Sequence, residues 1–90
     1  MSFPRLIPLS DRYYAYVFEK AGDELPLHDH PFTHDTVVTS GKIEWFSERR
    51  REAVEAWHVI TFPAGVRHGI VAVTDGAAIV QVNFSPIFVP

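Results

Sequence analysis

The sequence has no cysteine among its 90 residues. This absence excludes a disulfide framework and any metal site built on thiolates. A metal ion would therefore have to be held by imidazole or carboxylate groups. Since no disulfide needs an oxidising compartment, we expect a cytoplasmic protein.

The sequence also lacks an excess of positive charge. Eight Lys and Arg residues against eleven Asp and Glu residues give a formal charge of −3, which argues against nucleic acid as a partner. The basic run 49–51 lies between Glu48 and Glu52, so we expect a solvated loop in preference to an anion site.

Long apolar runs are missing as well. No stretch approaches the ~20 residues that would cross a bilayer, so we expect no membrane partner. Pro4 and Pro8 interrupt the N-terminal stretch, which does not resemble a signal peptide.

Apolar residues are plentiful for a chain of this size. The composition is 47% hydrophobic and 13% aromatic, with 21% charged residues. A chain this short forms one small domain, here residues 1–90, whose interior cannot hide so much apolar surface. The composition therefore predicts a homodimer, in which a second copy would cover the remainder.

Short segments rich in β-branched and aromatic residues follow one another along the chain. We predict strands over 13–19, 36–40, 42–47, 58–62, 66–74 and 77–84, separated by turns that contain Gly22, Gly41, Gly65 and Gly76. Only residues 49–56 could form a helical turn. The pattern predicts an all-β fold, a single small antiparallel β-barrel, whose interior has room for side chains or one small ligand.

Histidines form the most informative pattern in the sequence. His28 and His30 are separated by one residue, so both side chains project from the same face of an extended chain. His34 follows after a short bend, and His68 comes from a distant strand. We predict that these four meet inside the barrel and bind one divalent transition metal ion. His58 has no histidine at ligand spacing, and we leave it out.

This spacing resembles the first motif of the cupin superfamily. The motif runs as Gly22, five residues, His28, one residue, His30, three residues, His34, six residues and Gly41. The family usually has Glu at the position of His34. The resemblance thus implies a cupin-like double-stranded β-helix, or jelly-roll, with four histidine ligands.

A second stretch resembles the other cupin motif. Pro63, Gly65 and His68 keep its Pro-x-Gly-x-x-His core, although Trp57 and Ala72 replace the glycine and asparagine that usually bracket it. With neutral imidazole in place of a carboxylate, the bound ion keeps its full charge and acts as a stronger Lewis acid. The predicted ligands do not distinguish among Mn, Fe, Ni and Zn. The alternative to an open site is a structural one, in which four histidines surround Zn in a closed tetrahedron.

Few acid–base groups accompany the predicted ligands. Asp29, Asp35 and Arg67 each lie next to a ligand in sequence, so strand alternation directs them outward. No nucleophile–base pair is evident, and no catalytic residue is assigned. Any chemistry would therefore depend on the metal.

Three residues are candidates for contact with a substrate. Thr36 and Gln81 could face the interior of the barrel or equally its outer surface, and Phe46 could line a pocket or belong to the core. The resemblance implies a metal-dependent enzyme that acts on a small oxygen-chelating molecule. Fe or Mn would suit dioxygenase-type chemistry, and Zn or Ni isomerase, cyclase or lyase chemistry. The alternative is a non-catalytic module that binds a metal or a small ligand.

Overall fold

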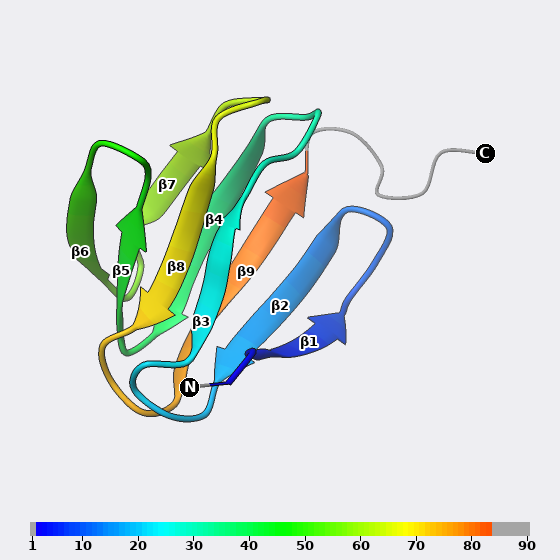
Figure 1. The fold of residues 1–90 in the computed structure, drawn as a ribbon. Coiled ribbons are helices and arrows are strands. Elements are labelled where there is room, and N and C mark those ends of the chain that lie inside the picture. Colours follow the sequence, from blue (N-terminus) through cyan, green and yellow to red (C-terminus); the bar gives the residue numbers. More distant parts are fainter. Residues whose placement is uncertain (1, 84–90) are drawn as a thin grey trace.

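The chain folds into nine antiparallel strands in two facing sheets, with no helix among the described residues (Figure 1). The structure is a computed structural model that describes residues 2–83. The strands are β1 (Arg5–Pro8), β2 (Tyr13–Phe18), β3 (Glu24–His28), β4 (His34–Ser40), β5 (Lys42–Phe46), β6 (Arg51–Glu55), β7 (Val59–Phe62), β8 (His68–Ala72) and β9 (Ala77–Asn83). The described part of the chain contains no helix suited to crossing a membrane.

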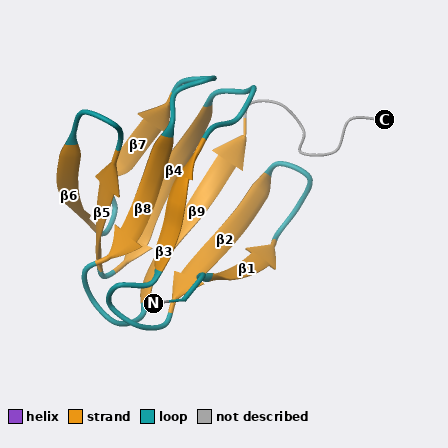
Figure 2. Cartoon of the chain, in the orientation of Figure 1, coloured by secondary structure: helices purple, strands orange, loops and turns teal. Residues whose placement is uncertain are grey.

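The two sheets differ in size. One has five strands in the order β1-β2-β9-β4-β7, and the other has four in the order β3-β8-β5-β6. Figure 2 shows strands joined only by turns and loops within the described range. The prediction of an all-β fold of antiparallel strands is confirmed. The barrel is not closed, because no strand pairing within residues 2–83 joins one sheet to the other.

Alternating burial along the strands builds the core between the sheets. In β4, His34, Thr36 and Val38 are buried while the residues between them are partly exposed. Every second residue of this strand therefore faces the interior, which includes polar as well as apolar side chains. The apolar core comprises Phe18, Leu25, Val38, Ile43, Val54, Phe62, Ile70, Ala72, Ala77 and Ile79.

The expectations for this segment were wrong in part, because residues 49–56 do not form a helical turn, although Arg49 and Arg50 do lie in a loop. The segment contains β6, which pairs with β5 in the register Phe46↔Arg51 through Lys42↔Glu55. Its charged side chains suit an exposed edge strand, because cross-strand pairs such as Arg51 with Glu44, 3.0 Å apart, stabilise it. Sequence patterning also missed β1 and β3. Residue 84, at the end of the last predicted strand, lies outside the described range.

The predicted turns are present. Gly41 has a φ of +70°, a conformation that L side chains rarely adopt. An added Cβ at this position would also lie 3.1 Å from the Cα of Ala77. Glycine is therefore required between β4 and β5 for two reasons, backbone conformation and space.

Three loops lie at one end of the sandwich. They connect β3 to β4, β5 to β6, and β7 to β8, near the top of Figure 1. Strand pairing explains this arrangement: His28 pairs with His68, and Phe46 pairs with the neighbouring Gly69. His34 begins β4 at the same end. The fold thus brings the motif histidines together from three strands and one loop.

Candidate metal centre

Three of the predicted ligands lie at metal-binding distance from one another. One ring nitrogen each of His28, His30 and His68 can be chosen so that all three lie within 4.8 Å of one another. His28 ends β3 and His68 begins β8, where the two residues pair across the strands. His30 lies just beyond β3. A single cation could contact all three rings from the space between them.

His34 borders this group without belonging to it by the same distance criterion. Its ring centroid lies 4.9 Å from that of His30 and 5.1 Å from that of His68. The side chain is fully buried, and neither ring nitrogen has a hydrogen-bond partner within the described residues. The three-histidine group is thus present, and the fourth ligand stays a prediction. We refer to His28, His30, His34 and His68 as the histidine cluster.

Backbone carbonyls orient two of these rings. The Nδ1 atom of His28 lies 2.7 Å from the carbonyl oxygen of Pro26, and that of His68 lies 3.0 Å from the carbonyl oxygen of Val66. A carbonyl only accepts, so Nδ1 carries the proton and Nε2 keeps a lone pair. Metal-binding imidazoles are commonly held in this way.

The inward ring atoms are left without partners. The Nε2 atoms of His30 and His68 are buried and form no hydrogen bond within residues 2–83. Unpaired buried polar atoms are costly and rare, so several of them together call for a physical explanation. A cation bound between the rings would satisfy them, and the donor set therefore fits a divalent transition metal ion.

Burial keeps the rings neutral. Desolvation, with a smaller contribution from neighbouring imidazoles, lowers the pKa of His34 to about 4. Desolvation also lowers the pKa of His68 to about 4 and lowers that of His30. Since only a neutral imidazole has a lone pair to donate, these rings are in the metal-binding form at neutral pH.

Two phenylalanines that sequence reasoning missed hold the imidazoles in place. Phe62, at the end of β7, stacks on His68 with ring centroids 4.0 Å apart and an interplanar angle of 8°. Phe32 stacks on His30 at 5.0 Å. The position of Phe32 inside the first motif was a signal for this contact. For Phe62 the sequence offered only its place directly before Pro63.

A hollow of about 190 Å³ opens beside two of the histidines. It is lined by Phe3, Tyr16, Leu25, Pro26, His28 and His30. It lies between β2 and β3, where the sheets are not joined. Burial raises the pKa of Tyr16, so its hydroxyl stays protonated near neutral pH. The hollow is mainly apolar, with one phenol and two imidazoles as its polar groups.

The predicted substrate-contact residues lie in the interior, away from this lining. Thr36 and Gln81 are buried and pair across β4 and β9. The Gln81 side-chain oxygen accepts a hydrogen bond of 3.0 Å from the Tyr14 hydroxyl, and the Thr36 hydroxyl has no partner in the described range. Phe46 is 7% exposed and packs against Gly69. Their contact with a substrate stays a prediction.

The charged neighbours of the ligands point away from the cluster. Asp29 and Arg67 are exposed, and Asp35 accepts a hydrogen bond of 2.6 Å from the Thr61 hydroxyl. His58 is also exposed, with its Nδ1 atom 3.1 Å from the Glu55 carbonyl oxygen. These placements agree with the predicted outward orientation, and they leave imidazole as the main polar chemistry of the cluster.

Comparison with known proteins gives a clear result for the fold. No family profile and no curated sequence matches the chain. Among solved structures, an RmlC-like cupin protein from Desulfovibrio desulfuricans is 28% identical, with a TM-score of 0.71 over 88% of this chain and 78% of that one. A cupin superfamily protein from Desulfitobacterium hafniense DCB-2 is 13% identical, with a TM-score of 0.75 over 92% and 77% of the two chains.

A third structure agrees with these two. It is a cupin-2 domain containing protein from Shewanella frigidimarina NCIMB 400, 21% identical, with a TM-score of 0.68 over 92% of this chain and 78% of that one. Such similarity supports a place in the cupin superfamily, and the chain has the double-stranded β-helix fold of the cupins.

Proposed function

We propose that the protein binds one divalent transition metal ion through His28, His30, His34 and His68 and uses it to act on a small oxygen-chelating molecule. The observation that carries this proposal is the convergence of buried Nε2 atoms that have no protein partner in the described range. Carbonyl contacts at Nδ1 of His28 and His68 support it, because they direct the opposite nitrogen inward.

A bound ion of this class would supply Lewis acidity toward a carbonyl or, for Fe and Mn, redox chemistry with dioxygen. The chain supplies position and environment. Phe62 and Phe32 restrict the imidazole planes by stacking, and burial excludes water from His34. The apolar hollow beside His28 offers room for an organic molecule, and the protonated Tyr16 hydroxyl can donate a hydrogen bond there.

A non-catalytic binding module is the second candidate. The scarcity of acid–base groups favours it, because Asp29 and Arg67 are exposed and Asp35 already bonds Thr61. An enzyme and a binding module would share the metal ligands. They differ in whether the bound ion keeps positions open to water or substrate.

Metal content tests the central proposal. Protein purified without added ions should contain about one equivalent of a transition metal by elemental analysis, and His68→Gln should lose it. His34→Gln tests the fourth ligand, for which we expect at least a tenfold loss of affinity. His58→Gln is the matched control, because His58 is exposed. Metal-free parent protein that takes up no Mn, Fe, Ni or Zn at neutral pH would refute the proposal.

Water exchange separates the enzyme from the binding module. After loading with Mn²⁺, the relaxation rate of water protons should rise well above that of metal-free protein if coordination positions are open. No enhancement, with the metal bound by four imidazoles, would exclude the catalytic candidate.

We also propose a homodimer. Phe3, Leu6, Leu9 and Tyr13 are large side chains that remain exposed on or beside β1 and β2. Within the described residues, β1 pairs only with β2, so its outer edge is open to a second copy. Light scattering should give twice the mass of the chain, and a monomer at high concentration would contradict the dimer.

A further inference from the structure

A second hollow lies at the same end of the sandwich as the histidine cluster. Its volume is about 450 Å³, and its walls come from the β5–β6 loop and from the segment before β8. The lining residues are Ser47, Glu48, Arg49, Arg50, Val66 and Arg67. We call this feature the arginine hollow.

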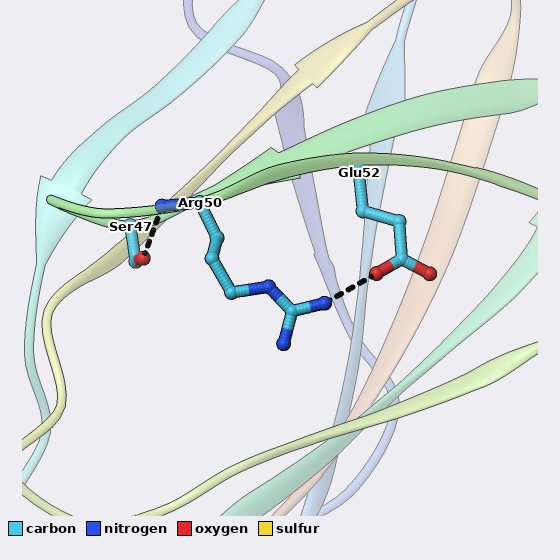
Figure 3. Close-up of polar contacts among 3 residues, drawn as sticks. All are labelled: Ser47, Arg50 and Glu52. Carbon is cyan, nitrogen blue, oxygen red and sulfur yellow. Dashed lines mark hydrogen bonds and ion pairs between the residues drawn. The ribbon is translucent and has the colours of Figure 1, made fainter.

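The β5–β6 loop is held in one conformation by Ser47. The backbone N–H of Ser47 donates to the carbonyl oxygen of Arg50 at 2.8 Å. The Ser47 hydroxyl oxygen accepts from the backbone N–H groups of Arg49 and Arg50 at 3.2 and 3.1 Å. Figure 3 shows the contact with Arg50. A turn fixed from both sides presents its arginines at low cost in conformational entropy.

The guanidinium of Arg50 is also positioned. It donates to a Glu52 carboxylate oxygen at 3.0 Å, as Figure 3 shows. It also lies over the Trp45 ring, 5.4 Å from the ring centroid. A guanidinium that is held in this way still has other N–H groups to donate. The Arg50 side chain is therefore held in position by Glu52 and still has N–H groups available for a ligand.

Positive charge in the arginine hollow exceeds negative charge. Three arginines line it against one glutamate. Glu48 lies 3.6 Å from Arg67, a loose pair with both side chains more than half exposed. The Arg49 guanidinium forms no ion pair or hydrogen bond within residues 2–83. The excess is local, since the whole chain has a formal charge of −3.

We propose that the arginine hollow is a binding site for a small oxyanion, either a phosphate group or a dicarboxylate. Guanidinium groups match the oxygen geometry of both and remain charged at all relevant pH values. Arg50 is balanced by Glu52, so one positive charge remains in excess after Glu48 is counted, and this charge attracts an anion. This differs from the expectation of a plain solvated loop, because two segments far apart in sequence line the hollow.

The anion site is separate from the histidine cluster. Arg67 directly precedes His68, but Arg67 is exposed while His68 is buried. Binding of an anion to the arginine hollow should therefore need no metal. Its test is independent of the proposed metal function, and either proposal can fail alone.

Titration of metal-free protein with inorganic phosphate and with malonate, followed by two-dimensional NMR at constant ionic strength and pH 7.5, tests the site. We expect saturable shifts of the 47–50 and 66–67 amides with a Kd in the millimolar range. The stronger of the two probes identifies the ligand class. No saturable shift with either, or shifts that appear only after metal is added, would overturn the proposal.

Variants test the assignment to these residues. Arg49→Gln and Arg67→Gln should each weaken binding about tenfold, the loss expected for one charged hydrogen bond, and Glu48→Gln should strengthen it. Arg12→Gln is the matched control, because Arg12 is an exposed arginine between β1 and β2. Equal weakening by Arg12→Gln would reduce the effect to general attraction and refute the site. Within the described residues the Arg49 side chain forms no hydrogen bond or ion pair, so its variant reports on binding even if another variant misfolds.

Discussion

The histidine cluster and the arginine hollow lie on two sides of one short segment, residues 66–68, and place charge in opposite ways. His68 is 1% exposed and packed against Phe62, whereas the Arg67 side chain is 52% exposed. Imidazole can give up its proton when it is buried, and guanidinium cannot. The fold therefore uses neutral bases inside and permanent cations outside.

This difference predicts how each region is linked to stability. His34 and His68 of the histidine cluster are buried beside the core, so changes to these two residues alter metal binding and folding together. Most side chains of the arginine hollow are exposed, so changes there should alter binding with little effect on folding. Four measurements test this difference between the two regions.

Phe62→Ala should have the largest effect. Phe62 is 3% exposed and touches both His68 and His34 with its ring. Truncation leaves a cavity, and we expect the free energy of unfolding to fall by about 3–5 kcal/mol. Urea denaturation measures this loss, and metal affinity should fall as well because His68 loses the ring that orients it.

Trp57→Ala is the control for that measurement. Trp57 is 76% exposed and lies outside the proposed dimer surface, so removal of its side chain should change stability by less than about 0.5 kcal/mol. A loss from Phe62→Ala no larger than this would show that the histidine cluster is not coupled to the core.

The sequence predicted the fold class correctly but indicated only some of the strands. Alternating strands and glycine turns indicated six of the nine strands, because those strands have an apolar face. The edge strands β1 and β6 were not predicted, because their side chains are mostly exposed and show no periodic apolar pattern. In β3, Pro26 interrupts the alternation.

The motif spacing correctly predicted that His28, His30 and His68 lie together, because the pairing of strands determines which residues lie opposite one another. The contacts of the rings with Phe62 and Phe32 could not be read in this way. Stacking depends on the packing of two sheets against each other, and spacing within one segment contains no information on that. The arginine hollow was missed for the same reason, since Arg67 joins Arg49 only in the folded chain.

Acid should destabilise the metal-free protein through the cluster. His34 and His68 have a pKa of about 4 when folded, against about 6.5 when unfolded. Between these values the unfolded chain binds protons that the folded chain excludes, so stability is lost as pH falls from about 6.5 to 4. The loss approaches about 3 kcal/mol for one ring. Denaturation across this range should show it.

The matched variants are His34→Gln and His58→Gln. Removal of the buried ring should flatten the decrease in stability between pH 6.5 and 4, and removal of the exposed ring should leave it unchanged. Equal slopes in all three proteins would mean that buried imidazoles do not control acid sensitivity.

Gly69→Ala should have an intermediate effect. An added Cβ would overlap the Phe46 ring and lie 2.8 Å from the Leu25 carbonyl oxygen. Overpacking of this kind costs about 1–3 kcal/mol. In a Phe46→Leu background the ring contact is absent, so the same substitution should cost less. A double-mutant cycle measures the coupling, and additive losses would show that the ring does not limit this site.

Glu48→Gln should have the smallest effect on folding. The nitrogen and oxygen of the pair with Arg67 lie 3.6 Å apart and both side chains are exposed, and such pairs contribute at most about 1 kcal/mol. Thermal denaturation of the variant should therefore match the parent, while its affinity for phosphate rises. A loss of more than about 1 kcal/mol in the free energy of unfolding would mean that Glu48 stabilises the β5–β6 loop and does not merely balance its positive charge. If stability is unchanged, the arginine hollow can vary its charge without cost to the fold, whereas the buried imidazole of His68, next to Arg67, cannot.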